Sequence, residues 1–167
     1  MDEVYGVTID GPSDIVIASC GGYPNDINVY QLQKTMDNAW CVVREGGAVI
    51  IIGECEGGSD SAALEKTMRD NPSPESIKAA LEKRFVIGAN KAFAIMRFMK
   101  RAKFILVSGM EKEMSELMFF EHAASMEEAM KKAGDIAGCD ANIILMPQGG
   151  LTLPRIKNNL PTGFFLV

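Results

Sequence analysis

The sequence has very few of the residues that build metal centres and disulfide frameworks. His122 is the single histidine among 167 residues, and the four cysteines are scattered without a CxxC pair. Because imidazole and thiolate are the usual protein ligands of transition metals, the chain by itself does not carry a typical ligand set of that kind. The scattered cysteines also indicate reduced thiols in a cytoplasmic protein rather than a disulfide framework.

Positive charge and long apolar runs are scarce as well. Lys and Arg number 17 against 22 Asp and Glu, so the net charge is −5 and nucleic-acid binding has no electrostatic support. No apolar run approaches the roughly 20 residues that span a bilayer. The start, Met1-Asp2-Glu3, is too acidic and polar for a signal peptide. We therefore expect a cytoplasmic protein that binds neither nucleic acid nor membrane.

Apolar residues are plentiful and follow an alternating order of elements. They make up 47% of the chain, against 23% charged residues, which predicts a single domain over residues 1–167 with a substantial core. Strand-like runs alternate with helix-like segments, which is typical of a parallel α/β sheet. The expected strands are 4–9, 14–19, 48–53, 104–108 and 142–146, with a short extended piece at 119–123, and the expected helices are 26–43, 60–70, 74–83, 90–101, 112–119 and 125–137. The sequence thus predicts an α/β fold, a Rossmann-like three-layer sandwich with a mostly parallel sheet and helices on both faces.

Polar and small residues mark where several of these elements begin and end. Asn25 or Asp26 is expected to cap the helix 26–43, and the glycine pair Gly46-Gly47 is expected to end it. The strand 142–146 is expected to be the last buried strand. The tail from Gln148 is rich in Gly, Pro and Asn, so we expect it to run over the surface.

One strand-to-helix turn stands out as a candidate ligand site. The apolar run 14–18 leads into a loop with two glycines and a proline, and the helix that follows carries Tyr30, Gln31 and Lys34 in its first turns. Ligands gather at such turns in α/β sheets, because strand ends meet helix N-termini there. Gln31 and Lys34 are three residues apart and share one helix face, where an ammonium and an amide can hold a carboxylate or a phosphate.

A simpler interpretation of Lys34 is an ion pair with Asp37 or Asp26 on a solvated helix face. Lysines on helix surfaces are common, so spacing alone favours this alternative. The glycines of the preceding loop do not form a GxGxxG fingerprint or a P-loop, which leaves a standard dinucleotide site weakly supported.

Three other titratable residues are weaker candidates. Glu54 and Glu56 follow the strand 48–53, in a second loop at a strand's carboxyl end. They are placed for acid–base work, although carboxylates in turns are more often only solvated. His122 lies in a peripheral segment and is expected to be structural or exposed rather than catalytic.

The strand-to-helix turn that follows the apolar run 14–18 also carries a family resemblance. The run from Asp14 to Lys34, with Gly21-Gly22-Tyr23-Pro24 and Tyr30-Gln31 in fixed places, resembles the signature of the nickel-dependent lactate racemase family in its C-terminal domain. The resemblance covers nearly the whole chain. Further segments in the family's order are 37–39, 46–47, 54–57, 88–92, 107–108 and 146–147.

The resemblance implies one half of a two-domain enzyme. Members of that family have an active site in the cleft between two α/β domains and use a nickel-pincer nucleotide, a nickel ion held by a modified pyridinium nucleotide. The lysine and histidine that anchor it, and the two histidines that move the proton while hydride leaves and returns to the substrate's α-carbon, belong to the N-terminal domain. This chain has no counterpart of that domain, so we expect no catalytic residue, no metal ligand and no cofactor bound to this chain alone.

For the C-terminal domain the resemblance implies a grip on a small 2-hydroxy acid, lactate or a related one. Lys34 would hold the substrate carboxylate, Gln31 would orient it, and Tyr30 would line the pocket. The family often has histidine where this chain has Asn90, and we assign that position no role. The chain departs most from the family in the missing half, which predicts that it is inactive alone.

Two alternatives come from other functional classes. One is a stand-alone α/β module that binds a small carboxylate or a nucleotide without catalysis. The other is an interaction domain whose loop 19–34 meets a partner chain. An apolar patch uncovered by the absence of the N-terminal half would also favour a homo-oligomer.

Overall fold

The computed structural model describes residues 5–71, 73–83 and 89–157. It contains a five-stranded sheet of order β5-β4-β3-β2-β6, in which every pairing is parallel, and a two-stranded parallel sheet of β1 and β7. The strands are β1 (Gly6–Ile9), β2 (Ser13–Ser19), β3 (Val43–Ile52), β4 (Lys103–Val107), β5 (Glu121–Ala123), β6 (Ile143–Met146) and β7 (Leu153–Ile156). The helices are α2 (Val29–Trp40), α3 (Ala62–Asp70), α4 (Pro74–Lys83), α5 (Ala89–Arg101), α6 (Lys112–Leu117) and α7 (Met126–Ala137).

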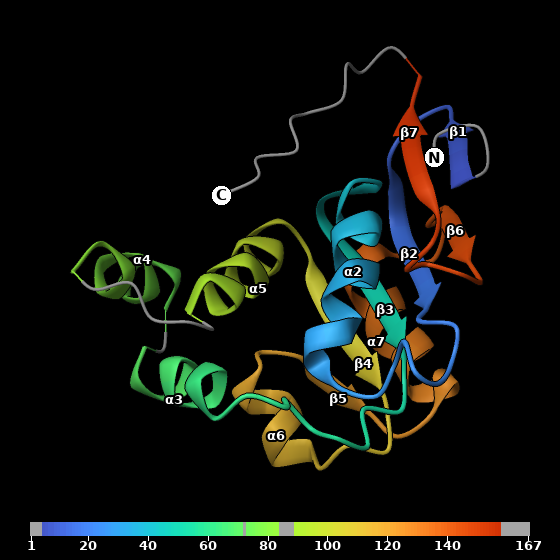
Figure 1. The fold of residues 1–167 in the computed structure, drawn as a ribbon. Helices are drawn as coiled ribbons and strands as arrows, with labels where there is room; N and C mark the ends of the chain where they lie inside the picture. Colours follow the sequence, from blue (N-terminus) through green and yellow to red (C-terminus); the bar gives the residue numbers. More distant parts are fainter. Residues whose placement is uncertain (1–4, 72, 84–88, 158–167) are drawn as a thin grey trace.

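The large sheet is covered on both faces, as Figure 1 shows. Alternate residues of β3 point to opposite sides: Val49 and Ile51 join the core under α2 and α5, while Ala48 and Ile50 join the core under α7. All four are fully buried, which explains why residues 48–52 of this strand form a continuous apolar run. The prediction of a Rossmann-like three-layer sandwich is therefore confirmed.

The helix expected over 26–43 is shorter at its end, and the prediction for the two glycines is wrong. α2 ends at Trp40, and β3 already begins at Val43 rather than at residue 48. Its pairing with β2 moves from Val43 to Ala48 within two residues of the partner strand, so residues 44–47 form a bulge. A Cβ on Gly47 would lie 2.6 Å from the Asp14 carbonyl oxygen, so glycine is needed here for close strand approach.

The start of α2 also differs from the expectation. Asn28, not Asn25 or Asp26, caps the helix: its side chain accepts a hydrogen bond from the backbone N–H of Gln31 at 2.9 Å. Asp26 instead accepts a hydrogen bond from the backbone N–H of Glu54 at 3.2 Å and so links two loops. Three polar residues within positions 25–28 offer several caps, and the position of the neighbouring loop selects one of them.

The end of the chain is the second correction. β6 lies at an edge of the large sheet, and the exposed fractions of Ile143 and Leu145 are 47% and 65%, so it is not a buried strand. It is not the last strand either, because β7 follows it and pairs in parallel with β1. Pairing between two distant short segments has no local signal, which is why the expected surface tail contains a strand.

The strand order places a switch point beside β2. From β2 the chain adds β3, β4 and β5 in one direction, and α7 then returns it to β6 on the other side of β2. The loops after β2 and β6 meet here, because the Gly149 N–H donates a hydrogen bond to the Ser19 carbonyl at 2.8 Å. Crevices for ligands form at such points in open α/β sheets. Within the described residues, none of the helices has the length and apolar character to cross a bilayer.

Candidate functional site

The first turn of α2 is held by side chains and backbone from the loop after β3. Asn28 is buried, and its amide nitrogen donates a hydrogen bond to the Asp60 carboxylate at 2.9 Å while its oxygen caps the helix. The Val29 N–H donates to the Gly58 carbonyl at 2.9 Å. The residues that follow therefore project from a fixed helix start, where the helix dipole favours negative charge.

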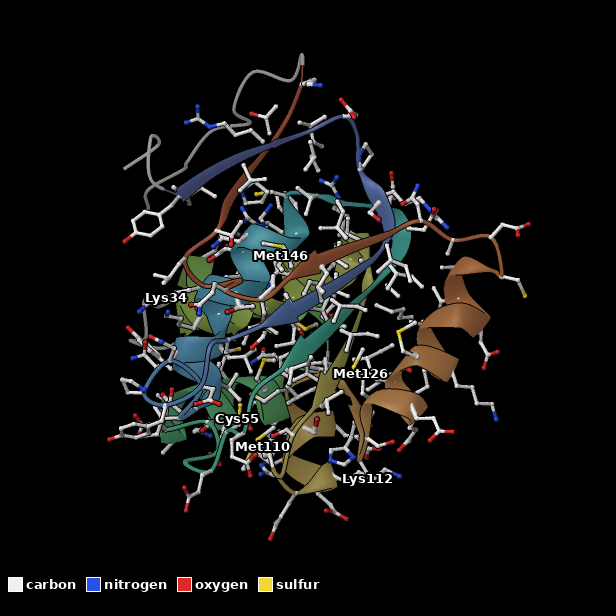
Figure 2. The ribbon with its side chains drawn as sticks, turned by 90° about the vertical axis from the view of Figure 1, so that its right-hand side faces the viewer. Lys34, Cys55, Met110, Lys112, Met126 and Met146 are labelled. Carbon is white, nitrogen blue, oxygen red and sulfur yellow. The ribbon has the colours of Figure 1, made fainter. Side chains whose placement is uncertain are left out.

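The structure brings Gln31 and Lys34 together. The Lys34 ammonium donates a hydrogen bond of 3.0 Å to the Gln31 side-chain oxygen. Among the described residues Lys34 forms no ion pair with Asp37 or Asp26, so the simpler interpretation of an ion-paired surface lysine is not what the structure shows. Figure 2 shows Lys34 at the outer side of α2. One of the three ammonium donors is used by this bond, and the side chain is exposed.

Tyr30 stands beside this pair and contacts a residue that sequence reasoning did not single out. The exposed fraction of Tyr30 is 46%, and the Lys91 ammonium lies 3.7 Å from the centre of its ring. Burial lowers the pKa of Lys91, the charge of Asp37 opposes this effect, and the charge of Lys34 adds to it. Residues 88–92 are one of the segments that resemble the family. That resemblance is the signal in the sequence that could have pointed to Lys91.

A hollow of the described surface lies next to this group rather than within it. It has a volume of about 480 Å³ at the carboxyl ends of β2, β3 and β4. Its lining residues are Ser19, Gly22, Asp26, Ile52, Gly53, Glu54, Val107, Ser108, Gly109 and Ala124. Glu54 and Glu56 are both exposed, and of the two Glu54 lines this hollow. None of Tyr30, Gln31 and Lys34 lines it in the part of the chain that the structure describes.

The remaining candidate residues do not assemble into a metal centre. Burial raises the pKa of Cys20 to about 11 and that of Cys55 to about 12, so both stay as neutral thiols near pH 7. His122 lies half-buried in β5. In residues 5–71, 73–83 and 89–157 no three His, Cys, Asp or Glu side chains group closely enough to hold a metal ion. The donor set of these described residues therefore does not fit a nickel centre of its own. Gly88 and the side chain of Asn90 lie outside the described residues.

The chain is similar to known proteins over most of its length. The family model described as "Lactate racemase C-terminal domain" matches residues 9–152. A lactate racemase from Thermoanaerobacterium thermosaccharolyticum is 30% identical over 151 residues, which are 87% of this chain and 35% of that protein. A lactate racemase from Lactiplantibacillus plantarum is 28% identical over 141 residues, 81% of this chain and 33% of that protein.

Solved structures agree with these sequence matches. The lactate racemase apoprotein from T. thermosaccharolyticum superposes with a TM-score of 0.86 at 29% identity, over 92% of this chain and 38% of that one. A protein from Thermotoga maritima superposes with a TM-score of 0.61 at 12% identity, over 93% of this chain and 40% of that one, and shows a common fold alone. The chain spans about a third of the length of the curated relatives it matches.

Proposed function

The chain belongs to the lactate racemase C-terminal domain family, and on that premise we propose that it is the substrate-gripping domain of a racemase or epimerase acting on lactate or a related 2-hydroxy acid. The observation that carries this proposal is the Lys34–Gln31 hydrogen bond of 3.0 Å at the exposed start of a firmly capped helix. The curated relatives are about two and a half times as long as this chain, which supports a second, N-terminal domain across the cleft.

The roles of the three side chains follow from their chemistry. The Lys34 ammonium supplies a positive charge and N–H donors for the substrate carboxylate. Because the Gln31 oxygen is turned toward Lys34, its NH₂ group is the end that can donate to the substrate. The Tyr30 ring lies one residue before Gln31 and forms an apolar wall beside them. A carboxylate held at two points leaves the α-carbon in a fixed orientation, which lowers the entropic cost of reaction.

The groups that break and remake the bond at the α-carbon would lie outside this chain. The family resemblance implies a nickel-pincer nucleotide, which accepts and returns hydride when it is bound. The described residues offer no ligand set for it, so the proposal places both the cofactor and the proton-transfer groups in the N-terminal domain. What this chain's own residues do is bind and orient the substrate. Its four free cysteines, two buried and two exposed, suit a reducing compartment, which is why we propose a cytoplasmic location.

The substrate grip is tested by Lys34→Ala in the two-domain protein that carries this domain. We expect kcat/KM for lactate racemisation to fall about a hundredfold, because the carboxylate loses its charged anchor and the α-carbon its orientation. The rate is measured by chiral chromatography of lactate. Lys112→Ala is the matched control, since Lys112 is an exposed lysine on α6 with only a 3.6 Å contact to Glu116.

Two results would decide against the assignment. Unchanged kinetics in Lys34→Ala would remove Lys34 from the site. An equal loss in Lys112→Ala would show that any lysine removed from the surface harms the enzyme. A circular dichroism melt of each variant separates these outcomes from a loss of fold, because exposed lysines contribute little to stability.

A further inference from the structure

Lys91 is a charged residue from another element that contacts the substrate-gripping group of Tyr30, Gln31 and Lys34. It lies in the first turn of α5, half-buried, and its ammonium is 3.7 Å from the centre of the Tyr30 ring. α2 and α5 pack against each other on the same face of the sheet, as Figure 1 shows. Only this packing brings the two residues together, because they are far apart in the sequence.

We propose that Lys91 is a positioning residue of the substrate site, which holds the Tyr30 ring from the neighbouring helix and adds a second positive charge beside Lys34. This inference rests on the proposed function, since it assumes that Tyr30 and Lys34 face a 2-hydroxy acid. It assigns a role to a residue outside the group that the sequence pointed to.

The first part of the argument is the orientation of Tyr30. A tyrosine at 46% exposure on a helix surface samples more than one side-chain rotamer unless something contacts its ring. An ammonium over the ring face is attracted by the negative charge of the π system and selects one orientation. The ring then stands as a fixed wall next to Gln31 and Lys34, and less ordering is left for the moment of substrate binding.

The second part is the charge around the group. Asp37 and Lys34, both on α2, act electrostatically on Lys91 among the described residues, and Arg97 acts on Asp37 from α5. Lys34 and Lys91 are like charges whose repulsion disfavours the protonated form of Lys91. A carboxylate that binds Lys34 relieves this repulsion. Anion binding is therefore favoured by both ammonium groups, even though only one of them contacts the anion.

The electrostatic attraction between Lys91 and Asp37 suggests a simpler role, in which Lys91 only links α5 to α2. That role predicts a change in stability when Lys91 is removed and none in the affinity for lactate. The experiment therefore measures affinity separately from stability.

The test uses the 167-residue chain with isotope-labelled lysine side chains and lactate as the probe. Nuclear magnetic resonance gives the dissociation constant of lactate from the shift of the Lys34 signal, and the ring current of Tyr30 displaces the Lys91 signal. We expect Lys91→Met to raise the dissociation constant about five- to tenfold. Lys91→Arg keeps the charge and the ring contact, so it retains near-normal affinity at neutral pH.

A matched control and a coupled variant make the test specific. Lys100→Met removes a lysine of the same helix whose partner is Glu75 at 2.5 Å, and it is expected to leave the affinity unchanged. In a Tyr30→Leu background Lys91→Met should have a clearly smaller effect, because part of its action passes through the ring. Lys91→Arg should also move the first alkaline loss of lactate binding to higher pH, because guanidinium does not deprotonate in that range.

The outcomes separate the two proposals. If lactate shifts the Lys34 signal but Lys91→Met binds it as tightly as Lys100→Met does, the inference about Lys91 is overturned and the substrate grip stands. If lactate shifts no Lys34 signal in any variant, either in the 167-residue chain or in the two-domain protein that carries it, the substrate grip fails and the inference about Lys91 fails with it. If Lys91→Met lowers only the unfolding temperature, Lys91 is a structural link and the inference is wrong.

Discussion

Asp14, half-buried at the start of β2, makes contacts across strands. Its carboxylate accepts hydrogen bonds from the Arg44 side chain, in the bulge of β3, and from the Asn142 N–H at 3.0 Å, just before β6. The Asp14 N–H in turn donates to the Asn142 side chain at 2.8 Å. The hydrogen bond from Arg44 and the bond from the Asn142 backbone hold the pKa of Asp14 below its usual range. One carboxylate thus joins three neighbouring strands at the end of the sheet opposite the site.

These contacts predict an acid-dependent contribution to stability. Because the pKa of Asp14 is lower in the folded chain than in the unfolded one, its contribution is present above the unfolded value and is lost as the pH falls through the folded value. Thermal unfolding of Asp14→Asn should therefore occur at a lower temperature than in the native chain at neutral pH. The two unfolding temperatures should converge below about pH 4.

Asp70→Asn serves as the control for this residue. Asp70 pairs only with Lys66, at 2.7 Å within the exposed surface of α3, and such pairs contribute little. Its unfolding temperature should follow that of the native chain at every pH. A constant difference between Asp14→Asn and the native chain down to the lowest pH would mean that ionisation of Asp14 does not contribute.

At the scale of elements, the start of α2 decides where the substrate-gripping residues point. The Asn28 side chain makes two hydrogen bonds, to the Gln31 N–H and to the Asp60 carboxylate, both of 2.9 Å. The loop after β3 therefore sets the first turn of a helix that follows β2. A displacement of this first turn therefore also displaces Gln31 and Lys34.

Asn28→Ala is expected to lower both stability and lactate binding. The lost cap and the unpaired buried groups should lower the free energy of unfolding by about 1–2 kcal/mol, measured by urea denaturation. Ser125→Ala is the matched control, since Ser125 caps α7 on the opposite face of the sheet with a 3.2 Å bond to the Glu128 N–H. It should cost a similar free energy and leave lactate affinity unchanged. Equal losses of affinity in both variants would show a general effect of stability.

At the scale of the whole molecule, the group around Lys34 is an open surface rather than an enclosed pocket. Tyr30 and Lys34 are exposed, and the hollow of about 480 Å³ lies beside them with other lining residues. A chain that spans about a third of its relatives' length is expected to hold only one wall of their active site. The stand-alone binding module remains the alternative, and the hollow is the observation that favours it.

Calorimetry distinguishes a single wall from a complete binding site. We expect the 167-residue chain to bind lactate at least about tenfold more weakly than the two-domain protein, because one wall leaves most of the ligand in water. The isolated chain should also racemise no lactate. Equal affinity in both proteins would favour the stand-alone module, and Glu54→Gln, which alters the hollow but not α2, would then show where the ligand lies.

Much of the fold and part of the site followed from local patterns. The apolar run of β3 indicated a central strand, and Ser125 with Glu128 marked the start of α7. The three-residue spacing of Gln31 and Lys34 placed them on one helix face. These features depend on periodicity, which a few consecutive residues define, so the sequence by itself determined them.

Other features depended on contacts between distant segments, and only the tertiary structure decided them. The glycine pair at 46–47 lies in a bulge because β3 extends back to pair with Ser13. The strand β7 forms because it pairs with β1. Lys91 met Tyr30 because α5 packs against α2. No local pattern encodes such pairings, since their free energy is gained only when both partners are already in place.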